Sequence, residues 1–142
     1  QSVTYLGAGA FADCTKLVYA QVPAAIQAVR ERTFRNCTEL KNVSIPEGIR
    51  YIGAAAFQND VSLQTVDFAQ SLLTICDNAF EGSGVGEGLV LPPALRTIGS
   101  RAFAGCMRLT SLSRQILEKW EVRHLQMDHH HQLCVHLAVQ HI

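Results

Sequence analysis

A phenylalanine recurs every 23 residues along this chain of 142 residues. Five of the six phenylalanines lie on that column: Phe11, Phe34, Phe57, Phe80 and Phe103. A fixed period of about 20 to 50 residues is typical of proteins built from stacked supersecondary units. One unit of this size cannot bury its own apolar face, so neighbouring units must cover one another. The period therefore predicts a repeat array, and each 23-residue unit is called a rung below.

The columns beside the phenylalanine keep the same phase. Three residues after it lie Cys14, Cys37, Asp60, Ser83 and Cys106. Six residues after it lie Leu17, Leu40, Leu63, Gly86 and Leu109. Residues 43–45 (Val-Ser-Ile) and 66–68 (Val-Asp-Phe) alternate apolar and polar side chains. This period of two predicts one short, half-buried strand in each rung. Pro46 has no N–H to donate to a neighbouring strand, so we expect it to end the strand before it.

The segment around each phenylalanine is too short for a long helix. An Ala or Thr precedes every phenylalanine of the column, and a Gly often lies a few residues earlier. We interpret this segment as one tight helical or 3₁₀ turn that directs the phenylalanine into the core. Phe57, in the middle of the array, is expected to be fully buried.

The repeat resembles the BspA-type leucine-rich repeat, also called the Treponema pallidum type, whose pattern runs roughly I-G-x-x-A-F-x-x-C-x-x-L-x-x-V-x-I-P-x-x-I. Residues 34–46, FRNCTELKNVSIP, match it closely. The resemblance implies an α/β fold: a right-handed leucine-rich-repeat solenoid with a parallel sheet on its concave side and short helical or 3₁₀ turns opposite. Residues 1–113 would form five repeats, the first and last partial. Residues 114–142 would form a C-terminal cap or a non-repeat tail.

Charge and composition exclude several classes of protein. The chain has 12 basic and 12 acidic residues and no net charge, so no basic stripe marks a nucleic-acid partner. No run of about 18 apolar residues predicts a membrane span. The sequence does not begin with Met and opens partway through a rung. We therefore expect a fragment or a processed chain, and the lack of a signal-peptide pattern says little about location.

The five cysteines allow two interpretations. The first is a functional role, as a disulfide ladder or a metal site, and the second is that they are buried free thiols. Three of them, Cys14, Cys37 and Cys106, lie on the inward column three residues after the phenylalanine. The others are Cys76 and Cys134. No C-x-x-C pair occurs, and Asp60 and Ser83 interrupt the column. Because free cysteine is among the most buried residue types, we favour thiols that act as small apolar fillers.

The fourth rung departs from the pattern. Residues 82–88, GSGVGEG, replace the usual C-x-x-L segment. They meet neither nucleotide-binding fingerprint, so we interpret them as a loosened rung. Gly86 replaces a leucine and is expected to leave a leucine-sized gap, which Val85 fills in part.

The C-terminal segment differs from the array in composition. Its apolar residues near one helical face include Trp120, and we predict that this face caps the last rung. The alternative is that the segment is not native sequence. All six histidines lie here: His124, His129, His130, His131, His136 and His141. A metal site or a pH switch is possible in principle, but no H-E-x-x-H spacing occurs and we favour an exposed polar run.

Outward residues of the predicted strands form the candidate binding surface. They include Tyr19, Gln21, Asn42, Ser44, Thr65, Asp67 and Ser111. By the resemblance, this is the concave face on which partners of leucine-rich repeats commonly bind. Tyr19 is its one aromatic residue, and tyrosine is enriched among residues that dominate binding energy. The alternative is that these side chains face solvent and bind no partner.

No catalytic constellation is present, because the acidic residues are scattered and no serine lies in a nucleophile elbow. We therefore expect a non-enzymatic protein without a cofactor or metal, which recognises a protein or surface ligand through the concave face. Family members are often secreted or attached to the cell surface, where adhesion is a typical role. Two alternatives remain: an intracellular scaffold or regulatory segment of a larger protein, and a metal-responsive module that uses the histidine tail.

Overall fold

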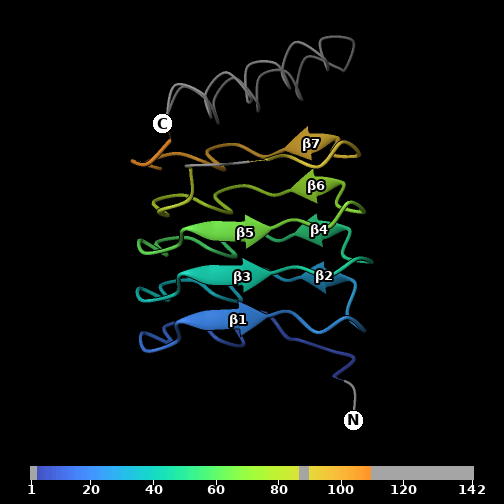
Figure 1. Cartoon of the computed structure of the whole chain (residues 1–142), viewed down its shortest axis with the longest axis horizontal. Coiled ribbons are helices and arrows are strands. Elements are labelled where there is room, and N and C mark those ends of the chain that lie inside the picture. The colour runs from blue at the N-terminus through green and yellow to red at the C-terminus, as the bar shows by residue number, and fades with distance from the viewer. Residues whose placement is uncertain (1–2, 87–89, 110–142) are drawn as a thin grey trace.

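The computed structural model describes residues 3–86 and 90–109, and over this range the rungs stack on one another in chain order (Figure 1). Strands β1 (Tyr19–Gln21), β3 (Asn42–Ser44) and β5 (Thr65–Asp67) form a parallel sheet in the order β1-β3-β5. Neighbouring strands are displaced by one repeat, so that Tyr19 pairs with Asn42 and Asn42 with Thr65. The predicted parallel sheet is confirmed.

A second parallel sheet runs beside the first and was not predicted. It consists of β2 (Ala28–Val29), β4 (Tyr51–Ile52), β6 (Thr74–Ile75) and β7 (Thr97–Ile98), paired in that order. The second residue of each strand is a fully buried Val or Ile. Each of these strands therefore contributes a core side chain and also joins its rung to the next through backbone pairing.

The phenylalanines form a stacked column through the core. Neighbouring rings lie 5.1 to 5.6 Å apart between centroids, with interplanar angles of 3 to 8°. Phe57, Phe80 and Phe103 have no exposed surface, whereas Phe11 at the end of the column is 41% exposed. The expected burial of Phe57 is thus confirmed.

The phenylalanine segments are hydrogen-bonded turns, and no helix occurs among the residues described. In the third rung, three i to i+3 bonds follow one another, from Ala56 N–H to Gly53, from Gln58 N–H to Ala55 and from Asp60 N–H to Phe57. Ala55 and Asn59, two residues on either side of Phe57, have positive φ angles of 57° and 64°. These left-handed residues interrupt a right-handed helix, so the structure does not support the predicted helical or 3₁₀ turn.

The fourth rung holds no leucine-sized gap, which corrects the expectation at Gly86. A Cβ atom built on Gly86 would lie 2.5 Å from the carbonyl carbon of Arg108 and 2.6 Å from the backbone nitrogen of Leu109. Val85 is buried beside it. The backbone of the fifth rung has moved into the space of the missing side chain, so glycine permits a close approach here.

Candidate recognition surface

Six of the seven residues of the predicted binding face lie on β1, β3 and β5, in two columns set by the strand register. One column consists of Tyr19, Asn42 and Thr65, and the other of Gln21, Ser44 and Asp67. Ser44 is half-buried and the other five are exposed. The seventh residue, Ser111, lies outside the described residues. These six side chains are called the strand face below.

The strand face is polar and carries little charge. Thr65 donates a hydrogen bond from its hydroxyl to the Asn42 side chain at 2.5 Å, which fixes two neighbours in the first column. Tyr19 is 56% exposed and offers a broad aromatic surface at one end. Asp67 is the one ionisable carboxylate among the six. The face can therefore make hydrogen bonds, one aromatic contact and one ion pair with a partner.

A hollow adjoins β5 on the side of the fourth rung. Its volume is about 430 Å³, and both Thr65 and Asp67 line it, together with Phe68, Val90 and Pro92. Val90 is 73% exposed. The hollow thus places apolar surface directly beside the Asp67 carboxylate. No column of the repeat predicts this hollow, because it lies where the fourth rung departs from the repeat.

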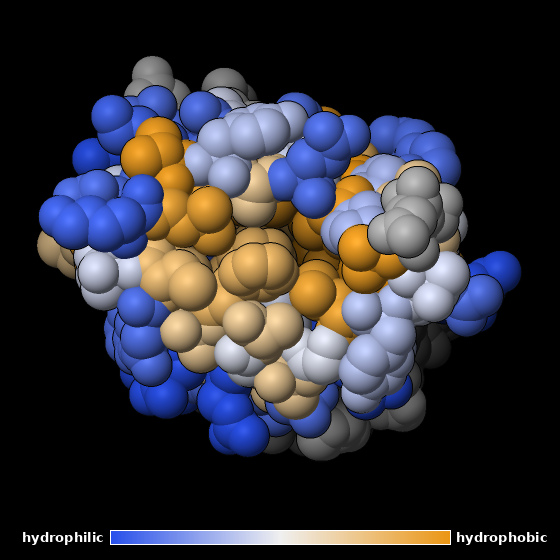
Figure 2. All heavy atoms as spheres, turned by 90° about the horizontal axis from the view of Figure 1, so that it is seen from below, coloured by the Kyte–Doolittle hydropathy of each residue, from blue (hydrophilic) through white to orange (hydrophobic). Residues whose placement is uncertain are grey.

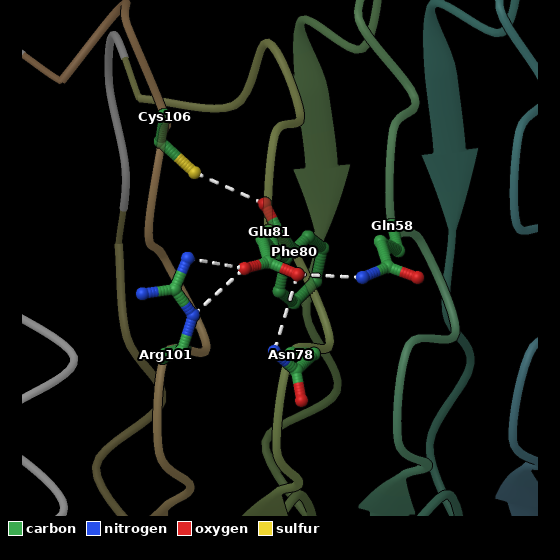
Figure 3. A network of polar contacts seen from close by, with 6 residues as sticks. All are labelled: Gln58, Asn78, Phe80, Glu81, Arg101 and Cys106. Atoms are coloured by element: carbon green, nitrogen blue, oxygen red, sulfur yellow. Dashed lines mark hydrogen bonds and ion pairs between the residues drawn. The ribbon is translucent and has the colours of Figure 1, made fainter. Parts of the chain in front are cut away.

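The side of the array that carries the phenylalanine turns is called the turn side below. Several of its polar side chains are hydrogen-bonded to one another. Glu81 is the centre of one network (Figure 3): Gln58 donates to its Oε1 at 2.5 Å, Asn78 donates to the same atom at 3.1 Å, and Arg101 donates two bonds to its Oε2 at 2.6 and 2.9 Å. Burial acts to raise the pKa of Glu81, but the hydrogen bonds from Arg101, Gln58 and Asn78 outweigh it and lower the pKa. Arg35 extends the network by donating to Gln58.

A second ladder on the turn side links residues one repeat apart. Asn36 donates from its side chain to Asp13 at 2.8 Å, and Asn59 donates to Asn36 at 3.0 Å. All three have positive φ angles. The side chains of this ladder are occupied in joining the rungs, which makes the turn side a poorer candidate for recognition than the strand face.

The inward column holds thiols and one carboxyl. Cys37 and Cys106 are buried free thiols that donate hydrogen bonds to the carbonyls of Phe11 and Phe80, at 3.2 and 3.1 Å. Burial raises the pKa of Cys37 to about 12, with the nearby Asp60 adding to the shift, and it raises the pKa of Cys106 to about 11. Both thiols are therefore protonated near neutral pH and poor nucleophiles. They act as hydrogen-bond donors as well as core filler.

The cap around Trp120, the six histidines and Cys134 all lie outside the described residues. Within residues 3–86 and 90–109, no group of three or more His, Cys, Asp or Glu side chains is arranged to hold a metal ion. Over the same range, no helix is long and apolar enough to cross a membrane.

Comparison with known proteins places the repeat in a family. The model for the BspA type leucine rich repeat region matches residues 4–119 in six copies. A leucine-rich repeat protein from Bacteroides ovatus is 29% identical with a TM-score of 0.68, over 72% of this chain. A leucine rich cell surface protein from Faecalibacterium prausnitzii is 30% identical with a TM-score of 0.67, over 73% of this chain. The T. pallidum leucine rich repeat protein is 26% identical with a TM-score of 0.59, over 67% of this chain.

The chain spans only part of these three structures. It covers 27% of the B. ovatus protein, 27% of the F. prausnitzii protein and 47% of the T. pallidum protein. No curated protein matches the chain.

Proposed function

Since this chain belongs to the BspA-type leucine-rich repeat family and is on that ground a protein-interaction module, we propose that its partner binds across the strand face. The observation that carries the proposal is the arrangement of Tyr19, Asn42, Thr65, Gln21 and Asp67, which are exposed in two registered columns on one side of the array. On the turn side, by contrast, the side chains of Glu81, Asn36 and Asn59 are hydrogen-bonded to side chains of neighbouring rungs.

The chemistry of the strand face defines the kind of partner. Tyr19 offers an aromatic anchor, and Asp67 favours a basic residue or an N–H donor on the partner. The hollow beside Asp67 would take an apolar side chain next to that polar contact. An extended protein surface with alternating apolar and basic groups would satisfy all three features.

Adhesion at a cell surface is the setting that we favour. One similar structure is described as a cell surface protein, and the chain matches it over 73% of its own length. The alternative is an intracellular scaffold, and the buried free thiols of Cys37 and Cys106 would suit a reducing compartment. The proposed binding surface is the same in both settings. The metal-responsive alternative depends on the histidine tail, outside the described residues.

The test compares capture of partners by two double variants. Tyr19→Ala with Asp67→Lys alters the strand face, and Tyr51→Ala with Glu31→Lys makes the same chemical changes away from it. Tyr51 and Glu31 are exposed too. Proteins of the source organism captured by the immobilised chain are compared by quantitative mass spectrometry. We expect a partner that the first variant loses at least tenfold and the second retains. Equal retention by both variants would move the site away from the strand face.

A further inference from the structure

The two sheets behave differently at the boundary between the third and fourth rungs. In Figure 1 the second sheet continues across this boundary from β6 to β7, whereas β5 has only β3 as a partner among the residues described. The rings of Phe57 and Phe80 also stack across the boundary, 5.1 Å apart. The fourth rung is therefore joined to the third through the phenylalanine column and the second sheet, while the first sheet is interrupted within the described structure.

The backbone of Phe68, directly after β5, shows the interruption most clearly. Its equivalent in the second rung, Ile45, donates its N–H to the carbonyl of Asp67 in the third rung at 3.1 Å. The equivalent acceptor for Phe68 is the carbonyl of Val90, and this bond does not form. Within the described residues the Phe68 N–H donates to no backbone carbonyl, so this edge of the sheet keeps a free donor.

The core is also less well covered at this edge. Val66 and Phe68 are half-buried, whereas their equivalents Val43 and Ile45 are 2% and 4% exposed. Apolar surface is visible at the N-terminal end of the array too (Figure 2), where no described rung precedes the first. Val66 and Phe68 differ from that surface, because they belong to the third rung, which has a described rung on each side. Their exposure is thus a property of the fourth rung.

Two hollows follow this edge of β5. The one described above is lined by all three residues of β5 and by Phe68. A second, also of about 430 Å³, is lined by Gln64, Thr65, Gly84 and Arg108. Because both hollows are lined by Gln64 and Thr65, they adjoin each other, and together they are called the β5 slot below. The approach of Gly86 to the backbone of the fifth rung draws the fourth rung away from this space.

Opposite charges lie at the two ends of the β5 slot. Arg108 lines it beside Gln64, and Asp67 lines it three residues further along the strand, about 10 Å away at the rise of an extended chain. Both side chains are exposed, and neither forms an ion pair with another described residue. The slot therefore favours an extended occupant that carries an acidic group at one end and a basic group at the other.

We propose that the β5 slot accepts one extended segment of the protein partner, added as a strand parallel to β5. This inference rests on the proposed function and specifies how the partner is held. A carbonyl of the segment accepts the N–H of Phe68. Apolar side chains opposite Val66 and Phe68 enter the slot, while the residues opposite Thr65 and Asp67 are acidic and basic. The parallel direction follows from the charges, because an antiparallel segment of this order would bring its basic residue to Arg108.

The first test compares two labelled peptides that differ only in the order of their charges. TEVKIT has the acidic-apolar-basic-apolar order, and TKVEIT exchanges the two charges and keeps the composition. Binding to the full chain is measured by fluorescence anisotropy. We expect TEVKIT to bind at least ~10-fold more tightly. The chain with Asp67→Lys and Arg108→Glu exchanges the charges of the slot and should reverse this preference. Equal binding of the two peptides, or no binding of either, would overturn the proposal.

The second test separates strand addition from simple contact with the hollow. Hydrogen exchange of single backbone amides is followed by NMR in the full chain. Without peptide, the Phe68 amide should exchange faster than that of Ile45, which is already bonded. TEVKIT should slow exchange at Phe68 at least ~10-fold and leave Ile45 unchanged. Binding that does not protect Phe68 would contradict strand addition.

Two further outcomes identify which idea has failed. If the strand-face variant loses a captured partner and that partner leaves the Phe68 amide unprotected, the proposed function stands and the added strand is wrong. If that variant retains every partner, the proposed function fails whatever the peptides do. A dimer of the chain in analytical ultracentrifugation that protects Phe68 without peptide would also overturn the proposal, because a second copy would then fill the slot.

Discussion

The backbone N–H of Cys37 donates a hydrogen bond of 2.8 Å to Oδ1 of Asp60, a carboxyl that has no exposed surface. Oδ2 of the same carboxyl is buried and accepts no hydrogen bond. Asp60 occupies the position that cysteine holds in three other rungs, where Cys37 and Cys106 each donate to a phenylalanine carbonyl of the preceding rung. A neutral carboxylic acid could donate from Oδ2 in the same way, whereas an ionised one leaves a buried charge with a single partner.

From the environment of Asp60 we predict that the array loses stability as the pH rises. Burial raises the pKa of Asp60 to about 8, and the N–H of Cys37 offsets only part of the shift. Between the ordinary value of 3.8 and about 8, the folded chain keeps a proton that the unfolded chain has released. The free energy of unfolding should thus fall across this window, by at most about 1.4 kcal/mol per pH unit from this group. Urea unfolding at a series of pH values measures the slope.

The control for this prediction replaces Asp60 with the residue of the other rungs. Asp60→Cys removes the titrating carboxyl, so its slope should be smaller than that of the original chain, and the variant should be the more stable of the two near pH 8. Asp60→Asn separates the loss of charge from the change of shape. Equal slopes in all three proteins would mean that Asp60 keeps an ordinary pKa.

Phe57→Ala should be among the most damaging truncations in the array. Phe57 is fully buried and stacks on Phe34 and Phe80, so its removal leaves a cavity that costs ~3–5 kcal/mol of unfolding free energy. Phe11→Ala is the matched control, because Phe11 has one stacking neighbour and is 41% exposed. It should cost less than half as much in urea unfolding. A loss below about 1 kcal/mol for Phe57→Ala would contradict the role of the column.

The sequence predicted the features that follow directly from the period. A strict 23-residue spacing places Phe57 above Phe34 in every stacked arrangement, and the alternation at 43–45 and 66–68 decides which strand residues face outward. The second sheet was missed because strands of two residues, such as β4, are too short to show a period. The spacing placed Asp60 on the inward column, but the approach of Arg108 to Gly86 depends on how rungs pack, which no spacing reveals.

Only some of the residues with positive φ could be predicted from the sequence. Two residues after the phenylalanine lie Asp13, Asn36, Asn59, Gly82 and Gly105, which are the residue types that favour positive φ. Two residues before it, Arg32, Ala55 and Arg101 adopt positive φ without any such preference. These three positive φ angles could therefore not be predicted from residue type, and the helical or 3₁₀ turn is not confirmed.

Ala55→Gly should stabilise the chain. Ala55 has a φ of 57°, where an L-residue with a Cβ atom costs roughly 1–2 kcal/mol, and part of this cost is recovered with glycine. The greater freedom of glycine in the unfolded chain offsets the gain, so we expect a net increase of ~0.5 kcal/mol in unfolding free energy. Ala56→Gly, at the next residue, is the control and should destabilise, because Ala56 is buried at an ordinary φ. Destabilisation by both variants would show that Ala55 is not strained.

Gly86→Leu tests which account of the fourth rung is correct. If a leucine-sized gap existed, restoring the leucine of the other rungs would stabilise the array. In the structure, a Cβ at Gly86 would lie within 2.6 Å of three backbone atoms of Arg108 and Leu109, and backbone cannot rotate away as a side chain can. We expect a loss of ~1–3 kcal/mol in urea unfolding, typical of overpacking. Gly7→Ala is the control, because a Cβ there meets only the Tyr5 ring, at 3.6 Å, and should change stability by less than about 0.5 kcal/mol. A more stable Gly86→Leu variant would mean that the fifth rung does not approach so closely.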